Sequence, residues 1–163
     1  ITSIIGREEV MESAQSTFMS STFWTERIGP TAALAVLEVM KEFKSWDYIT
    51  KMGLAIRKGW QELADRNYLK ISHWGLPALA GFTIDSPNSM AYKTYITQEM
   101  LKNGFLAGNS VYVSTSHTSD IISRYFEVLD PIFTDIQNFE QDSSTPDSFL
   151  SGPICHDGFK RLN

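Results

Sequence analysis

The sequence predicts an α+β fold in which helices cover one face of a small sheet. Residues 30–66 carry apolar side chains at helical spacing, and from Tyr68 the pattern changes to alternation of apolar and polar residues. A third observation is a long helical pattern that begins near Thr118. The resulting order of helix, helix, strand, strand, helix, strand, helix is typical of α+β proteins. With 42% hydrophobic and 20% charged residues in a chain of 163, we expect a globular protein.

The N-terminal residues predict a buried strand that ends in a turn. Residues 1–5 include three isoleucines, and Gly6 follows them. A domain seldom opens with its most buried strand, so we interpret the chain as a fragment whose first strand joins a sheet supplied by preceding sequence. A short helix or turn is expected over residues 7–19, and a polar loop with aromatic residues over residues 16–27.

Two helices are predicted next. The first begins at Pro30, and because residues 32–43 are apolar nearly all round, we expect it to be buried on two sides. The second is expected to be capped by Ser45. Its apolar residues form one stripe: Ile49, Met52, Ile56, Trp60 and Leu63.

The sheet is predicted from three short strands. Residues 69–73 and 79–84 flank a turn at Gly75-Leu76-Pro77 and are expected to pair antiparallel, and residues 111–114 form a third strand.

Helices after the hairpin are predicted from Ser86 to about Asn103 and from Thr118 onward. Gly104 has the position of a left-handed C-cap, and Pro131 is expected to kink or split the final helix. From residue 142 we expect an irregular tail that orders only where it docks.

Composition excludes several classes of function. The net charge is −5 and no dense Lys/Arg cluster exists, which argues against nucleic acid and anionic membranes as partners. A single cysteine, Cys155, excludes an internal disulfide and a multi-cysteine metal site and fits a reducing cytoplasm. No apolar run approaches the roughly 18 residues of a membrane-spanning helix. The three histidines are too dispersed to predict a metal site.

The loop before Pro30 is the main candidate for binding. It places hydroxyl groups, an acid and a base next to a helix N-terminus, where backbone N–H groups favour an anion such as phosphate. The alternative is that Ser20, Ser21 and Thr22 only satisfy turns and caps. For His73 and His117, a packing or turn role is favoured over catalysis.

Several segments resemble the class III pyridoxal-phosphate-dependent aminotransferases, and among them the enzymes like glutamate-1-semialdehyde 2,1-aminomutase. The similar N-terminal segments are residues 5–11, Ser21-Thr22-Phe23 and the alanine-rich residues 30–35. The similar later segments are Gly75-Leu76-Pro77, residues 101–106, Ser116-His117-Thr118 and residues 158–162. The resemblance spans nearly the whole chain and is specific for the family, but not for a substrate.

The resemblance implies a fold and a domain organisation. The fold is that of the small C-terminal domain of a fold type I transferase, with helices on a short, three- to four-stranded, largely antiparallel sheet. Residues 1–30 correspond to the tail of the large cofactor-binding domain and residues 31–44 to a connecting helix. Residues 45–140 correspond to the small domain and residues 141–163 to an irregular tail. The family is further expected to be a cytoplasmic homodimer that acts on a small amino substrate.

The resemblance also implies site residues. The lysine that forms a Schiff base with pyridoxal phosphate lies upstream of residue 1, so we expect no catalytic residue here and no activity of the fragment alone. Thr22 matches a threonine that binds the cofactor phosphate of the partner subunit. Residues 24–29 replace a shorter link, which leaves open whether Thr22 or Thr25 holds the phosphate. Glu26 and Arg27 come near the partner's substrate, although a surface salt bridge is an equal alternative for Arg27.

A second hypothesis is that the chain is a stand-alone α+β module for binding or oligomerisation, without catalysis. The uncapped strand at Ile1 speaks against it.

Overall fold

The computed structural model describes residues 4–18, 22, 26–156 and 158 of the chain. The chain divides into two compact units, Ile1–Ser45 and Trp46–Asn163, and each is described by itself. Within the described residues, none of the helices combines the length and apolar character needed to cross a membrane.

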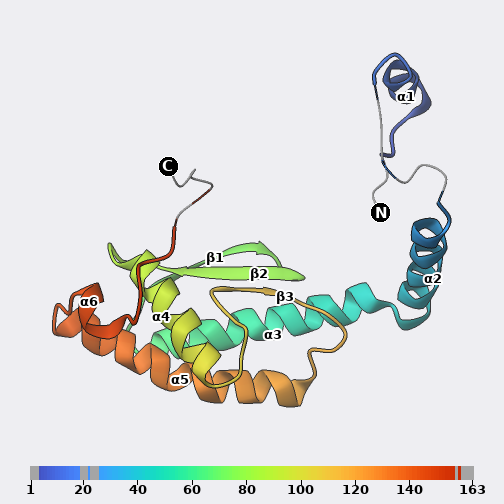
Figure 1. Cartoon of the computed structure of the whole chain (residues 1–163). Coiled ribbons are helices and arrows are strands. Elements are labelled where there is room, and N and C mark those ends of the chain that lie inside the picture. The colour runs from blue at the N-terminus through green and yellow to red at the C-terminus, as the bar shows by residue number, and fades with distance from the viewer. Residues whose placement is uncertain (1–3, 19–21, 23–25, 157, 159–163) are drawn as a thin grey trace. The chain divides into compact units, whose positions relative to one another are not determined.

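The N-terminal unit contains two helices, α1 (Glu8–Ala14) and α2 (Ile28–Phe43) (Figure 1). The acidic Glu8 and Glu9 lie in the first turn of α1, where the helix dipole stabilises negative charge. Of the helix or turn expected over residues 7–19, the structure has a helix, and the predicted α2 begins two residues earlier than the Pro30 start that the sequence indicates.

Two predictions for the N-terminal unit are wrong in its described part. Ile4 and Ile5 have no regular secondary structure and are 71% and 90% exposed, so the predicted buried strand is not formed there; residues 1–3 lie outside the described residues. Helix α2 has no buried residue, and Leu34 and Leu37 on it are 64% and 60% exposed. A strand needs a hydrogen-bonded neighbour and an apolar helix needs a packing partner, and the described residues of this unit supply neither.

The C-terminal unit is an α+β layer, which confirms the predicted fold class. Its sheet contains β1 (Ile71–Leu76), β2 (Leu79–Ile84) and β3 (Ser110–Tyr112) in the order β1-β2-β3, with both pairs antiparallel. The long helices α3 (Ser45–Arg66) and α5 (Ser119–Gln141) lie side by side on one side of this sheet (Figure 1). The remaining helices are α4 (Ser89–Lys102) and the short α6 (Pro146–Phe149).

The core lies between the sheet and the two long helices. The predicted stripe of α3 faces it: Met52, Ile56, Trp60 and Leu63 are at most 8% exposed. The Trp60 ring lies 4.8 Å from the Phe82 ring of β2, and Phe82 in turn lies 5.8 Å from Phe133 of α5. One aromatic row therefore joins α3, the middle strand and α5.

Helix ends follow the sequence in most places. Gly104 has a φ of +80° and ends α4 as predicted, with the Phe105 N–H donating to the Met100 carbonyl. Thr118 caps α5 by accepting the Ile121 N–H. Ser45 does not cap α3: it is the first helical residue, and its buried hydroxyl has no partner among the described residues.

Pro131 does not split α5, which continues through it to Gln141. The residues on both sides of Pro131 are held in the core by Leu129, Ile132 and Phe133, all at most 4% exposed. Tertiary packing thus outweighs the one backbone hydrogen bond that proline removes.

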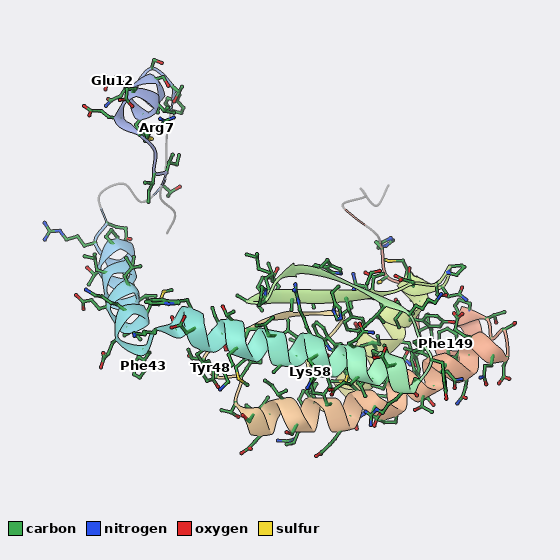
Figure 2. All side chains as sticks on the ribbon, turned by 180° about the vertical axis from the view of Figure 1, so that it is seen from behind. Arg7, Glu12, Phe43, Tyr48, Lys58 and Phe149 are labelled. Carbon is green, nitrogen blue, oxygen red and sulfur yellow. The ribbon has the colours of Figure 1, made fainter. Side chains whose placement is uncertain are left out.

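The C-terminal tail docks on α4 and α5. Phe149, labelled in Figure 2, stacks on Phe139 of α5 with ring centroids 4.3 Å apart. The Ser151 N–H donates to Gln98 Oε1 at 2.7 Å, and the Cys155 N–H donates to Thr94 Oγ1 at 2.9 Å. The tail predicted to be irregular from residue 142 thus contains the short helix α6, and its irregular part from residue 150 to 156 is held against α4 by these hydrogen bonds.

Candidate functional site

The loop before α2 is only partly described. Thr22 lies in a turn and is exposed, and Arg27 is exposed at the start of α2. Thr25 lies outside the described residues. The described residues therefore leave the choice between Thr22 and Thr25 open.

Glu26 has a defined role at the N-terminus of α2. Its Oε2 accepts the Ile28 N–H at 2.8 Å, and its Oε1 accepts the Gly29 N–H at 2.7 Å. Pro30 has no N–H, and the Thr31 N–H already donates to the Arg27 carbonyl at 3.0 Å. An internal carboxylate thus occupies the donors of the helix N-terminus that the sequence offered to phosphate.

This capping arrangement corrects one part of the sequence interpretation. A bound anion at this end of α2 has to use hydroxyl groups or displace Glu26, since the Ile28 and Gly29 N–H groups already donate to the Glu26 carboxylate. The Glu26 carboxylate also accepts hydrogen bonds from backbone N–H groups that have no acceptor within the helix. A side-chain cap of this kind typically stabilises the folded protein by about 1 kcal/mol. The signal available in the sequence was an acid two residues before the helix begins.

The lysines of the described part are nearly all exposed. Lys58 pairs with Glu62 at 3.4 Å, and Lys58 itself is labelled on α3 in Figure 2. Lys102 pairs with Glu99 at 2.6 Å. Lys93 of α4 differs, because it is half-buried and lines a pocket. Lys160 lies outside the described residues.

His73 and His117 have packing and turn roles in the C-terminal unit. His73 stacks near Trp60, with ring centroids 6.3 Å apart, and its Nε2 lies 3.2 Å from Gln61 Oε1. Burial and the charge of Arg57 lower the pKa of His73. His117 Nδ1 accepts the Ser114 N–H at 3.0 Å, which is a turn role. No group of three or more His, Cys, Asp or Glu side chains within the described residues is placed to hold a metal ion.

Comparison with known proteins places these residues in a wider context. No family model matches the chain. A 3-aminobutyryl-CoA aminotransferase from Cloacimonas acidaminovorans (strain Evry) is 23% identical over 135 aligned positions, and the match covers 79% of this chain and 33% of that protein. The match lies in the C-terminal part of the aminotransferase.

A solved structure is also similar over most of the chain. The structure of the PLP internal aldimine form of the FumI protein of Sphingopyxis sp. MTA144 matches with a TM-score of 0.72 at 18% identity. The match covers 84% of this chain and 34% of that one. The chain thus spans about a third of the length of the proteins it matches.

Removal of the Glu26 carboxylate tests its capping role. In Glu26→Ala, we expect amide hydrogen exchange of Ile28 and Gly29 to accelerate by roughly fivefold, because their acceptor is lost. The measurement is residue-resolved exchange by NMR on the full chain.

The matched control is Glu38→Ala, which removes an exposed carboxylate from the middle of α2 and should leave both amides unchanged. Equal exchange at Ile28 and Gly29 in the Glu26 variant and in the unaltered chain would contradict the capping role.

The fold agrees with the sequence similarity. The α+β layer matches about a third of the FumI structure with a TM-score of 0.72, and the sequence matches the C-terminal third of the aminotransferase. Over most of its length the chain therefore shares the fold of part of a PLP-containing protein and resembles in sequence the C-terminal part of an aminotransferase.

Proposed function

We propose that the chain is the C-terminal part of a class III aminotransferase or of an aminomutase like glutamate-1-semialdehyde aminomutase. The observation that carries this proposal is the match of 84% of the chain to one third of a PLP-containing structure. The aminotransferase relative supports the reaction class. The substrate in this proposal is an amino acid or amino-aldehyde, and the whole protein acts in the cytoplasm as a homodimer.

The domain organisation of this proposal assigns residues 1–30 to the tail of a large domain and residues 31–44 to a connecting helix. Residues 45–140 are then the small domain, followed by the tail 141–163. Two observations support it. The division between the two compact units falls next to Ser45, where α3 begins. Helix α2 is apolar yet has no buried residue, as expected of a helix whose partners belong to the large domain.

Pyridoxal phosphate, when bound, acts as the electron sink that lets an amino group leave one carbon and join another. In the proposed dimer, this chain's contribution is to bind the cofactor's phosphate on the partner subunit through the Thr22 or Thr25 hydroxyl. The exposed side chain of Thr22 fits such a contact from outside the chain. Because Glu26 occupies the α2 N–H groups, hydroxyl donors carry the phosphate in this proposal.

Arg27 is the better of the two proposed substrate contacts. It is exposed, and among the described residues it takes part in no salt bridge within 4.0 Å. Its guanidinium is suited to bind a substrate carboxylate in the partner's active site. The carboxylate of Glu26 is already engaged with two backbone donors, so its role is to fix the loop that carries Arg27.

The catalytic lysine is proposed to precede residue 1. None of the lysines in the sequence has the Gly-x-Gly context expected after that lysine. The 163-residue chain is therefore expected to have no aminotransferase activity, even with added pyridoxal phosphate.

The natural protein provides the test of this proposal. Immunoprecipitation with an antibody against this chain should yield a longer protein with the yellow absorbance of bound pyridoxal phosphate. Borohydride should remove that absorbance and leave the reduced cofactor covalently attached to a lysine upstream of residue 1. A natural protein that starts near Ile1, or one that binds no pyridoxal phosphate, would support the stand-alone module instead.

A substitution of Thr22 tests the phosphate contact in the same full-length protein. Thr22→Val should weaken retention of the cofactor by roughly tenfold, as expected when one hydrogen bond to a charged group is lost. The measurement is cofactor dissociation during dialysis, followed by absorbance.

Thr50→Val is the control, since Thr50 is exposed on α3 and has no proposed contact with the cofactor. Unchanged retention in Thr22→Val would transfer the role to Thr25 or remove it from this loop.

A further inference from the structure

A pocket of about 380 Å³ lies in the C-terminal unit, between α4 and the sheet. Its wall includes Trp74 of β1, Thr83 of β2, Ser89 and Lys93 of α4, and Asn109 before β3. The volume falls within the range of small-molecule sites, which begins at roughly 300 Å³. Trp74 and Thr83 belong to the face of the sheet that turns away from the Trp60 core, because strand residues alternate between faces.

The indole of Trp74 is held in a fixed orientation at this pocket. A Cβ atom on Gly81, the cross-strand partner of Trp74, would lie 2.3 to 2.5 Å from indole ring atoms, so the ring lies flat over the Gly81 backbone. The indole Nε1–H donates to Thr83 Oγ1 at 3.3 Å. The ring is still 44% exposed. These contacts make Trp74 a rigid, flat apolar surface that is open on one side.

The polar groups of the pocket favour a negative ligand. Lys93 and Ser89 are one turn apart on α4, and both are half-buried. Lys93 forms no salt bridge within 4.0 Å among the described residues, and no acidic residue lines the pocket. The local charge is thus positive in a chain whose net charge is −5.

One cation limits the charge of the ligand. A single lysine balances one negative charge, whereas a doubly charged group would leave one charge desolvated without a partner. Asn109 Nδ2 donates one of its two hydrogens to the Phe82 carbonyl at 2.8 Å and has a second N–H to offer a ligand. This donor set suits a carboxylate better than a phosphate dianion.

We propose that this pocket binds a small carboxylate with a flat apolar group. The flat group lies on Trp74, and the carboxylate pairs with Lys93 and accepts a hydrogen bond from the Ser89 hydroxyl. This binding goes beyond the aminotransferase function, because it needs neither pyridoxal phosphate nor the first 45 residues.

Benzoate is the probe for this site, since it combines a flat ring with one carboxylate. Titrated into the ¹⁵N-labelled chain, it should shift the Trp74 Nε1–H resonance saturably; a Trp74→Phe variant assigns that resonance. Benzamide, which has the same shape without the charge, should bind roughly tenfold more weakly, and inorganic phosphate should not saturate the site in the same range.

Substitutions of Lys93 separate charge from structure. Lys93→Met should weaken benzoate binding roughly tenfold, whereas Lys93→Arg should keep it within about threefold. Lys51→Met, an exposed lysine on α3, should leave binding unchanged.

The proposal is overturned by any of three results: benzoate leaves the Trp74 resonance in place, benzamide or phosphate binds as tightly as benzoate, or Lys93→Met binds as tightly as the unaltered chain. Because the readout is binding and not transfer of an amino group, these results are independent of whether the aminotransferase assignment holds.

Discussion

The C-terminal unit depends on the contacts of one side chain, Trp60. It is fully buried, and its indole N–H donates to the Tyr125 hydroxyl at 2.8 Å in a site closed to water. Burial raises the pKa of Tyr125 well above its usual value, so the hydroxyl stays neutral. The same indole packs on Phe82 of the middle strand. Removal of either hydrogen-bonding partner would leave a buried polar group unpaired, which costs about 1–3 kcal/mol. Helix α3, helix α5 and the sheet are thus fixed to one another at a single point.

The position of Trp60 also decides where ligands have access. Phe82 faces the helices, so its sequence neighbours Gly81 and Thr83, and Trp74 opposite Gly81, face away from them. Trp74 and Thr83 are therefore on the side of the sheet that the two long helices leave open. Trp74 and Thr83 of this face line the pocket with Lys93. Phe82 and Ile84, which belong to the core, also line it and hold that wall in place.

Residues in short-range patterns were predictable from the sequence, and those that depend on distant partners were not. The α3 stripe and the Gly104 cap follow from spacing and from backbone geometry within a few residues. The burial of α2 was expected from its apolar composition. Such a composition indicates that a helix packs against other elements, but it does not indicate whether this chain contains them. Ser45 fits the cap pattern but lies one position inside the helix. The continuity of α5 through Pro131 depends on core contacts that local rules omit.

The candidate site shows the same limit. A hydroxyl-rich loop before a helix predicts an anion site, and the sequence does contain that loop. Whether the donors are free depends on where the Glu26 carboxylate folds back, and this is a matter of loop geometry. The pocket at Lys93 could not be predicted from the sequence, because its residues come from two strands, a helix and a loop and have no regular spacing.

We infer that the residues from Ser45 onward fold around Trp60 without the N-terminal unit, and that α2 is an apolar helix whose partners lie elsewhere. Limited trypsin digestion of the 163-residue chain tests this most directly. We expect fast cleavage after the exposed Lys41 and Lys44 and a resistant product that begins at Ser45. Cleavage after Lys51 or Lys58 within α3 at the same rate, or resistance of α2 equal to that of α3, would contradict the account.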